Sequence, residues 1–182
     1  PVTEAQRVEA GVLLQSFTIA AADVPSGFTP AGARPVLPAD FVLDNGDPRR
    51  ELETLDLRAR RIITTDQTFT GSVSGYAAVV DVYTSLDTDP VSARLDVHRT
   101  GPPIDAIAPP LTLGDDEATY SAMVTADDGT QYSGVVVEWS HGPLVLAVEF
   151  LTEHGDVPAD TLATFMQSVE TAYQASAFAT TP

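Results

Sequence analysis

The stretch from Glu117 to Thr152 constrains the fold of this chain more than any other part of the sequence. It predicts three consecutive antiparallel strands joined by two tight turns. Asp128-Gly129 suits the positive φ angles that a two-residue type I′ turn requires, and His141-Gly142 is expected to form the second turn. A three-stranded meander is therefore the expected central element of the fold.

Loops of two residues at both turns fix which residues face each other across the predicted meander. Val137 should face Tyr120 on the first strand and Leu146 on the third. Alternation along each strand then gathers apolar side chains on one face, the expected core face, where Trp139 should be buried. This face consists of Ala118, Tyr120, Ala122, Val124, Ser133, Val135, Val137, Trp139, Leu144, Leu146, Val148 and Phe150.

The opposite face of the meander mixes polar and apolar side chains, as expected where a sheet is half solvated or lines a shallow groove. Gly134 removes a side chain from the middle strand and leaves room for a ligand or for another backbone. Glu138 and Glu149 would favour cationic or polyhydroxyl groups there. This face is the candidate ligand site, with the alternative that a helix from the first half of the chain covers it. The candidate residues are Met123, Tyr132, Gly134, Val136, Glu138 and Glu149.

Capping residues and apolar spacing predict four helices. Three are expected near residues 4–16, 47–60 and 89–100. The fourth begins at about Pro158, and its apolar stripe should pack on the core face of the sheet. The stripe consists of Leu162, Phe165, Met166, Val169 and Tyr173.

Alternating apolar residues predict two more strands at 62–70 and 73–86, with the turn at Gly71-Ser72. Residues 20–37 contain five prolines and glycines, so an irregular segment anchored by Phe28 is expected there. The predicted fold class is α+β. It has an antiparallel sheet of about five strands that includes the C-terminal meander, with helices packed mainly on one face.

Length and composition favour a single domain over residues 1–182, with a flexible tail at about 175–182. A chain of 182 residues with 43% hydrophobic residues can bury one sizeable core. Its apolar runs fall far short of the roughly 18 residues that indicate a membrane helix, so no membrane insertion is expected. Peripheral association with a membrane complex stays compatible with this composition.

Charge and cysteine usage exclude several classes of function. The net charge is -17, and residues 100–182 contain 12 acidic residues and no basic one, which disfavours nucleic acid and anionic lipid as partners. All nine basic residues are arginines. The absence of cysteine excludes disulfides, thiolate metal sites and a cysteine nucleophile.

The predicted register also argues against two catalytic or metal-binding pairs. Glu138 and Glu149 would lie four residues out of register, roughly 14 Å apart, whereas glycosidase pairs need about 5 to 9.5 Å. His141 and His154 would lie at opposite ends of one strand, roughly 40 Å apart, and cannot share a metal.

Two other kinds of motif lack the residues or the spacing of the sites they suggest. The run from Gly71 to Gly75 has Val73 where a nucleophile elbow needs serine. Acidic clusters at 44–47, 87–89 and 115–117 lack the spacing of an EF-hand, and turns or helix caps explain them, with calcium binding as the alternative. No catalytic residue, metal ligand or cofactor is predicted.

The order of short motifs along the chain resembles a loosely defined group of bacterial extracytoplasmic α+β domains. These motifs are Ala22–Phe28, Gly75-Tyr76, Val82-Tyr83, Ala93 in the next predicted helix, and the run Gly114 to Glu117 with Tyr120. Members of this group occur as lipoproteins and as extracellular sensor domains of membrane serine/threonine kinases. The chain departs from the group by one extra acid in Gly-Asp-Asp-Glu and by having no cysteine for lipid attachment.

The resemblance implies an exported, cell-surface or lipoprotein-like binding or sensing domain and no catalytic residue. We therefore expect a non-enzymatic, extracytoplasmic module whose partner is a small molecule or another protein. One alternative is a structural subunit of a surface or membrane-associated complex. Another is a small hydrolase or isomerase of unknown mechanism.

Overall fold

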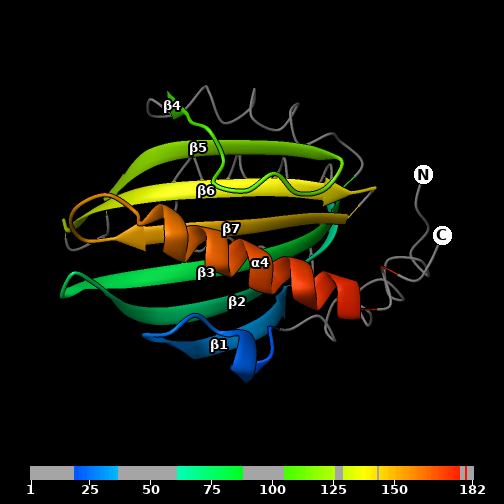
Figure 1. The fold of residues 1–182 in the computed structure, drawn as a ribbon, viewed down its shortest axis with the longest axis horizontal. Helices are drawn as coiled ribbons and strands as arrows, with labels where there is room; N and C mark the ends of the chain where they lie inside the picture. The colour runs from blue at the N-terminus through cyan, green and yellow to red at the C-terminus, as the bar shows by residue number, and fades with distance from the viewer. Residues whose placement is uncertain are drawn as a thin grey trace.

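A computed structural model describes residues 19–36, 61–87, 105–125, 129–142, 144–176 and 179. Within them, seven strands form one antiparallel sheet in the order β1-β2-β3-β7-β6-β5-β4, and helix α4 lies diagonally across one face (Figure 1). This architecture agrees with the predicted α+β class, but the predicted count of about five strands was too low. The elements are η1 (Ala21–Asp23), β1 (Phe28–Val36), β2 (Arg61–Val73), β3 (Tyr76–Asp87), β4 (Asp105–Ala106), β5 (Asp116–Thr125), β6 (Gln131–His141), β7 (Leu144–Thr152) and α4 (Ala159–Ala175).

Three of the predicted helices, near 4–16, 47–60 and 89–100, lie outside the described residues. The fourth is α4, which begins one residue after Pro158. Its buried side chains include Leu162, Phe165, Met166 and Val169, so the predicted apolar stripe packs on the sheet as expected.

Strand β1 corrects the prediction that residues 20–37 are irregular throughout. It pairs with β2 at one edge of the sheet, and its register shifts between Pro30 and Gly32. An edge strand is hydrogen-bonded on one side only, so it tolerates proline and a bulge that a central strand would exclude. Phe28 at the start of β1 is buried, as expected of an anchor.

The β2–β3 turn lies at Ser74-Gly75 rather than at Gly71-Ser72. Val73 faces Tyr76, and both turn residues have positive φ, 51° for Ser74 and 86° for Gly75, as a type I′ turn requires. Gly71 has a different role. A Cβ atom there would lie 2.7 Å from a ring carbon of Phe28, so the glycine permits close packing of β1 on β2.

The main core lies between α4 and the sheet. The ring centroid of Phe165 on α4 lies 5.1 Å from that of Phe28, 5.5 Å from that of Phe69 and 6.1 Å from that of Phe150. Trp139 is fully buried in the same cluster, as predicted. The segment between β4 and β5 completes this layer, because Leu111 and Leu113 pack against the core.

The predicted register of the meander is wrong at both turns, with different consequences. Val137 faces Val148 on β7 rather than Leu146, a shift of two residues that keeps every side chain on its predicted face. On the other side Val137 faces Thr119 rather than Tyr120, a shift of one residue that exchanges the two faces of β5. The face of β5 that carries Ala118 and Tyr120 therefore points away from α4.

The one-residue shift of β5 has an identifiable cause. The pairing of Thr125 with Gln131 leaves residues 126–130 between the paired strands instead of two. The hydrophobic pattern could not reveal the error, because Ala118, Thr119 and Tyr120 are all buried although they alternate between faces.

None of the helices in the described residues is long and apolar enough to cross a membrane.

Candidate functional site

The six predicted site residues do not share one face. Tyr132, Gly134, Val136 and Glu138 alternate along β6 on the face that points away from α4, and Glu149 of β7 faces Val136 there. The sixth residue, Met123, faces Ser133 and so lies on the α4 side of the sheet. Its assignment to the mixed face was therefore wrong, because of the one-residue shift of β5.

The face that points away from α4 is largely buried. Glu138 is 4% exposed, and Gly134, Ala118, Val145 and Ala147 are buried as well. Tyr132, Val136 and Glu149 are half-buried. A ligand role for the five residues on this face stays a prediction, but in this structure they do not form an open groove.

Polar side chains on this face contact one another. The Tyr83 hydroxyl donates to Glu149 Oε2 at 3.3 Å, and the Thr68 hydroxyl donates to Asp81 Oδ1 at 2.6 Å. Asp81 directly faces Glu149 across β3 and β7. The face is thus acidic, and the carboxylates of Asp81 and Glu149 each accept a hydrogen bond from a neighbouring hydroxyl.

The separation of Glu138 from Glu149 is also corrected. Glu138 faces Ala147, which places Glu149 diagonally opposite at about 7–8 Å rather than 14 Å. The distance argument against a glycosidase pair therefore fails. Burial gives another argument, since Glu138 as a residue is only 4% exposed and Glu149 is half-buried, so the pair does not flank an open cleft in this structure.

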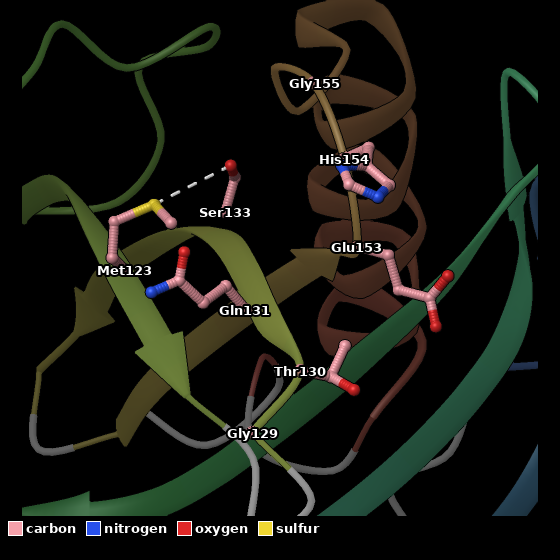
Figure 2. Close-up of a pocket in the computed structure, with 8 residues that line it drawn as sticks. All are labelled: Met123, Gly129, Thr130, Gln131, Ser133, Glu153, His154 and Gly155. Carbon is pink, nitrogen blue, oxygen red and sulfur yellow. Dashed lines mark hydrogen bonds between the residues drawn. The ribbon is translucent and has the colours of Figure 1, made fainter.

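A pocket of about 550 Å³ opens at the end of the sheet where β6 begins and β7 ends. We call it the end pocket. Met123 of β5 and Ser133 of β6 form one side, and residues that follow β7 form the other (Figure 2). Its lining consists of Met123, Gly129, Thr130, Gln131, Ser133, Glu153, His154 and Gly155.

Local side-chain and backbone contacts hold each side of the end pocket. The Ser133 hydroxyl approaches Met123 Sδ at 3.8 Å (Figure 2). Past the end of β7, the Glu153 N–H donates to the Ala77 carbonyl oxygen at 3.1 Å, and the Thr152 hydroxyl donates to the His154 carbonyl oxygen at 3.2 Å. The first of these bonds ties Glu153 to β3, and the pairing of Thr152 with Ser133 places Glu153 and His154 beside the β5–β6 hairpin.

Large apolar side chains are exposed in the wall of the end pocket and beside it. Met123 in its wall is 59% exposed. Tyr76 is 47% exposed, and its ring packs edge-on against the imidazole of His154, with the centroids 4.6 Å apart. The described lining otherwise offers two hydroxyls, an amide, a carboxylate and an imidazole, and it contains no arginine. It can therefore hydrogen-bond a polar group and contact an apolar one at the same time.

Sequence reasoning missed the end pocket because the pocket depends on the true register of β5. The predicted register placed Met123 away from Ser133. The one local signal was Gly155, whose φ of 79° allows the chain to turn sharply after β7.

A second polar cluster ties the β6–β7 hairpin to the last turns of α4. Glu170 Oε2 accepts the Trp139 indole N–H at 3.1 Å and lies 2.9 Å from His141 Nε2, while Gln174 donates to Glu170 Oε1 at 2.9 Å. The His141 ring stacks on Tyr173 with centroids 3.9 Å apart. We call this set the Glu170 cluster.

The Glu170 cluster favours an ionised carboxylate. Burial alone would raise the pKa of Glu170. Hydrogen bonds from His141, Gln174 and Trp139, together with the charge of His141, lower it by more than burial raises it, so the pKa of Glu170 lies below the ordinary value. Burial raises the pKa of Tyr173, and the charges of Glu170 and Asp115 add to this effect. All these groups are engaged with one another, which indicates a structural role.

The two described histidines lie far apart, since His141 faces the first residue of β7 and His154 follows its last. His98 is outside the described residues. Across the described part of the chain, no group of three or more His, Asp or Glu side chains could hold a metal ion. Comparison with family models, curated proteins and solved structures finds no match to this chain.

Proposed function

We propose that this chain is an extracytoplasmic, non-enzymatic binding module whose ligand site is the end pocket. The observation that carries the proposal is a pocket of about 550 Å³ that combines hydrogen-bonding side chains with the exposed thioether of Met123. Pockets of about 300 to 1,000 Å³ commonly hold small organic ligands. The extracytoplasmic location rests on the resemblance of the short motifs from Ala22 to Phe28 and from Gly114 to Glu117 to those of exported sensor and lipoprotein domains.

The charge of the pocket indicates which ligands it accepts. Glu153 contributes a carboxylate, and the whole chain has a net charge of -17. Anionic ligands would be repelled, whereas a cationic ligand would be drawn toward the protein. We therefore expect a small molecule with a neutral or cationic polar group and an apolar part that contacts Met123.

Three compounds that share a phenylethyl body test this expectation: phenethylamine, 2-phenylethanol and 3-phenylpropionate. The chain has two methionines, Met123 in the pocket wall and Met166 in the core, so methyl-¹³C-methionine NMR reports on both places. Phenethylamine should shift the Met123 signal at the lowest concentration, the alcohol at a higher one and the carboxylate at the highest. The Met166 signal should not move.

Gln131→Ala and Gln167→Ala form a matched pair of variants. Gln131 lines the pocket, whereas Gln167 is exposed on α4. Loss of one hydrogen bond of about 1 kcal/mol should weaken phenethylamine binding about fivefold in Gln131→Ala, and Gln167→Ala should bind like the wild type. The proposal is wrong if none of the three compounds shifts the Met123 signal or if both variants bind equally.

A further inference from the structure

The side chains that oxidise most readily are few in this chain and differ sharply in exposure. There is no cysteine, one tryptophan and two methionines. Trp139 and Met166 are fully buried, whereas Met123 is 59% exposed. Methionine oxidation follows exposure of the sulfur. Met123 is thus the one accessible sulfur atom of the chain.

The position of Met123 gives its oxidation a consequence. Its sulfur lies in the wall of the end pocket, 3.8 Å from the Ser133 hydroxyl oxygen. A thioether sulfur is a weak hydrogen-bond acceptor and an apolar contact surface. The sulfoxide is polar and chiral, and it no longer offers that surface.

We propose that Met123 is a specific oxidation site for peroxide-type oxidants and that its sulfoxide lowers the affinity of the end pocket for ligands with an apolar part. With hydrogen peroxide, the Met123 sulfur gives two electrons to one peroxide oxygen and the O–O bond breaks. The transferred oxygen loses its proton and forms the S=O bond, and the other oxygen takes up a proton and leaves as water. The Ser133 hydroxyl then donates to the sulfoxide oxygen. This draws a polar group into the wall that an apolar ligand would contact.

The fold should survive this change. Met123 pairs with Ser133 through the backbone ladder of β5 and β6, and its exposed side chain adds nothing to the buried core. Oxidation of Met166 would have the opposite effect, because a sulfoxide on the buried side of α4 would disrupt the packing of this helix against the sheet. Met123 is therefore the oxidation site, and Met166 is the internal control.

The first part of the test measures selectivity and does not depend on the proposed function. The full chain is treated with increasing hydrogen peroxide and then analysed by peptide mass spectrometry. The Met123 peptide should gain one oxygen completely while the Met166 peptide stays unmodified and the circular dichroism spectrum is unchanged. Parallel oxidation of Met123 and Met166 in the folded chain would overturn the inference.

The second part measures affinity, rests on the proposed function, and uses phenethylamine as the probe. Oxidation should weaken its binding about tenfold, which corresponds to about 1.4 kcal/mol. Met123→Leu should show no further loss of binding on peroxide treatment, while Met166→Leu should respond like the wild type. Equal binding before and after oxidation of Met123 would overturn the affinity change. Absence of binding to the unoxidised chain would overturn the proposed site and the affinity change, while the mass spectra would still decide selectivity.

Discussion

Trp139, two residues before the end of β6, donates its indole N–H to the carboxylate of Glu170 on α4, at 3.1 Å. The only tryptophan of the chain thus has its large apolar surface in the core and its single polar atom satisfied by the covering helix. His141 approaches the same carboxylate oxygen from the end of β6. The bonds to Glu170 therefore join β6 to α4 near the end of the helix.

Trp139→Ala should therefore be among the most destabilising single substitutions. Removing a fully buried indole leaves a large cavity, so we expect a loss of about 3 to 5 kcal/mol in the free energy of unfolding. Urea denaturation followed by circular dichroism measures it. Tyr76→Ala is the control, because an exposed aromatic residue should cost only about 0.5 kcal/mol. Similar losses in the two variants would contradict the core position of Trp139.

Glu170 should make stability depend on acidic pH. Its folded-state pKa is lowered below the ordinary value of 4.5, so its carboxylate stabilises the fold above that pH and the contribution is lost as pH falls through the folded pKa. The difference in unfolding free energy between wild type and Glu170→Gln should be largest near neutral pH and shrink below about pH 4.5. Glu153→Gln serves as a carboxylate-to-amide control. A constant difference across this range would refute the assignment.

Gly71→Ala should be destabilising although the new side chain is one methyl group. Its Cβ atom would lie 2.5 Å from the Gly27 carbonyl oxygen and 2.7 Å from the Phe28 ring. Relief of this overlap must move β1 away from β2, at a cost of about 1 to 3 kcal/mol. The neighbouring exposed Ser72→Ala should be close to neutral in the same thermal melt. Equal melting temperatures for both variants would show that β1 yields without cost.

Gly134→Val tests whether the face away from α4 is an open site or a packed surface. Gly134 is buried between strands β5 and β7, where it faces Ala122 and Leu151. Overpacking should therefore lower the unfolding free energy by about 1 to 3 kcal/mol. A variant of unchanged stability that loses ligand binding would instead support the ligand site predicted on this face.

The sequence predicted those elements whose pattern has one interpretation. The stripe of α4 and the core face shared by β6 and β7 follow from strict periodicity, so Trp139 and Phe165 were placed correctly. Strand β1 was missed because Pro30 and Gly32 suggest a loop unless the strand is known to lie at an edge.

The candidate site was less predictable because it depends on loop length. Ala118 and Tyr120 are buried away from α4 and Thr119 is buried toward it, so alternation fits either orientation of β5. Only the number of residues between Thr125 and Gln131 decides which face Met123 joins. No local sequence pattern indicates the length of this loop. The end pocket forms only because this loop length places Met123 beside Ser133.

The prolines of β1 have a consequence for how copies of this protein behave when crowded together. A paired edge strand can hold proline only where its nitrogen points outward, so Pro30 and Pro35 deprive the outer border of β1 of two hydrogen-bond donors. A second molecule that tried to extend the sheet there would meet gaps in the ladder and a bulge between Pro30 and Gly32. This border should therefore resist fibril-like stacking, and replacing both prolines with threonine should make concentrated solutions more prone to aggregate.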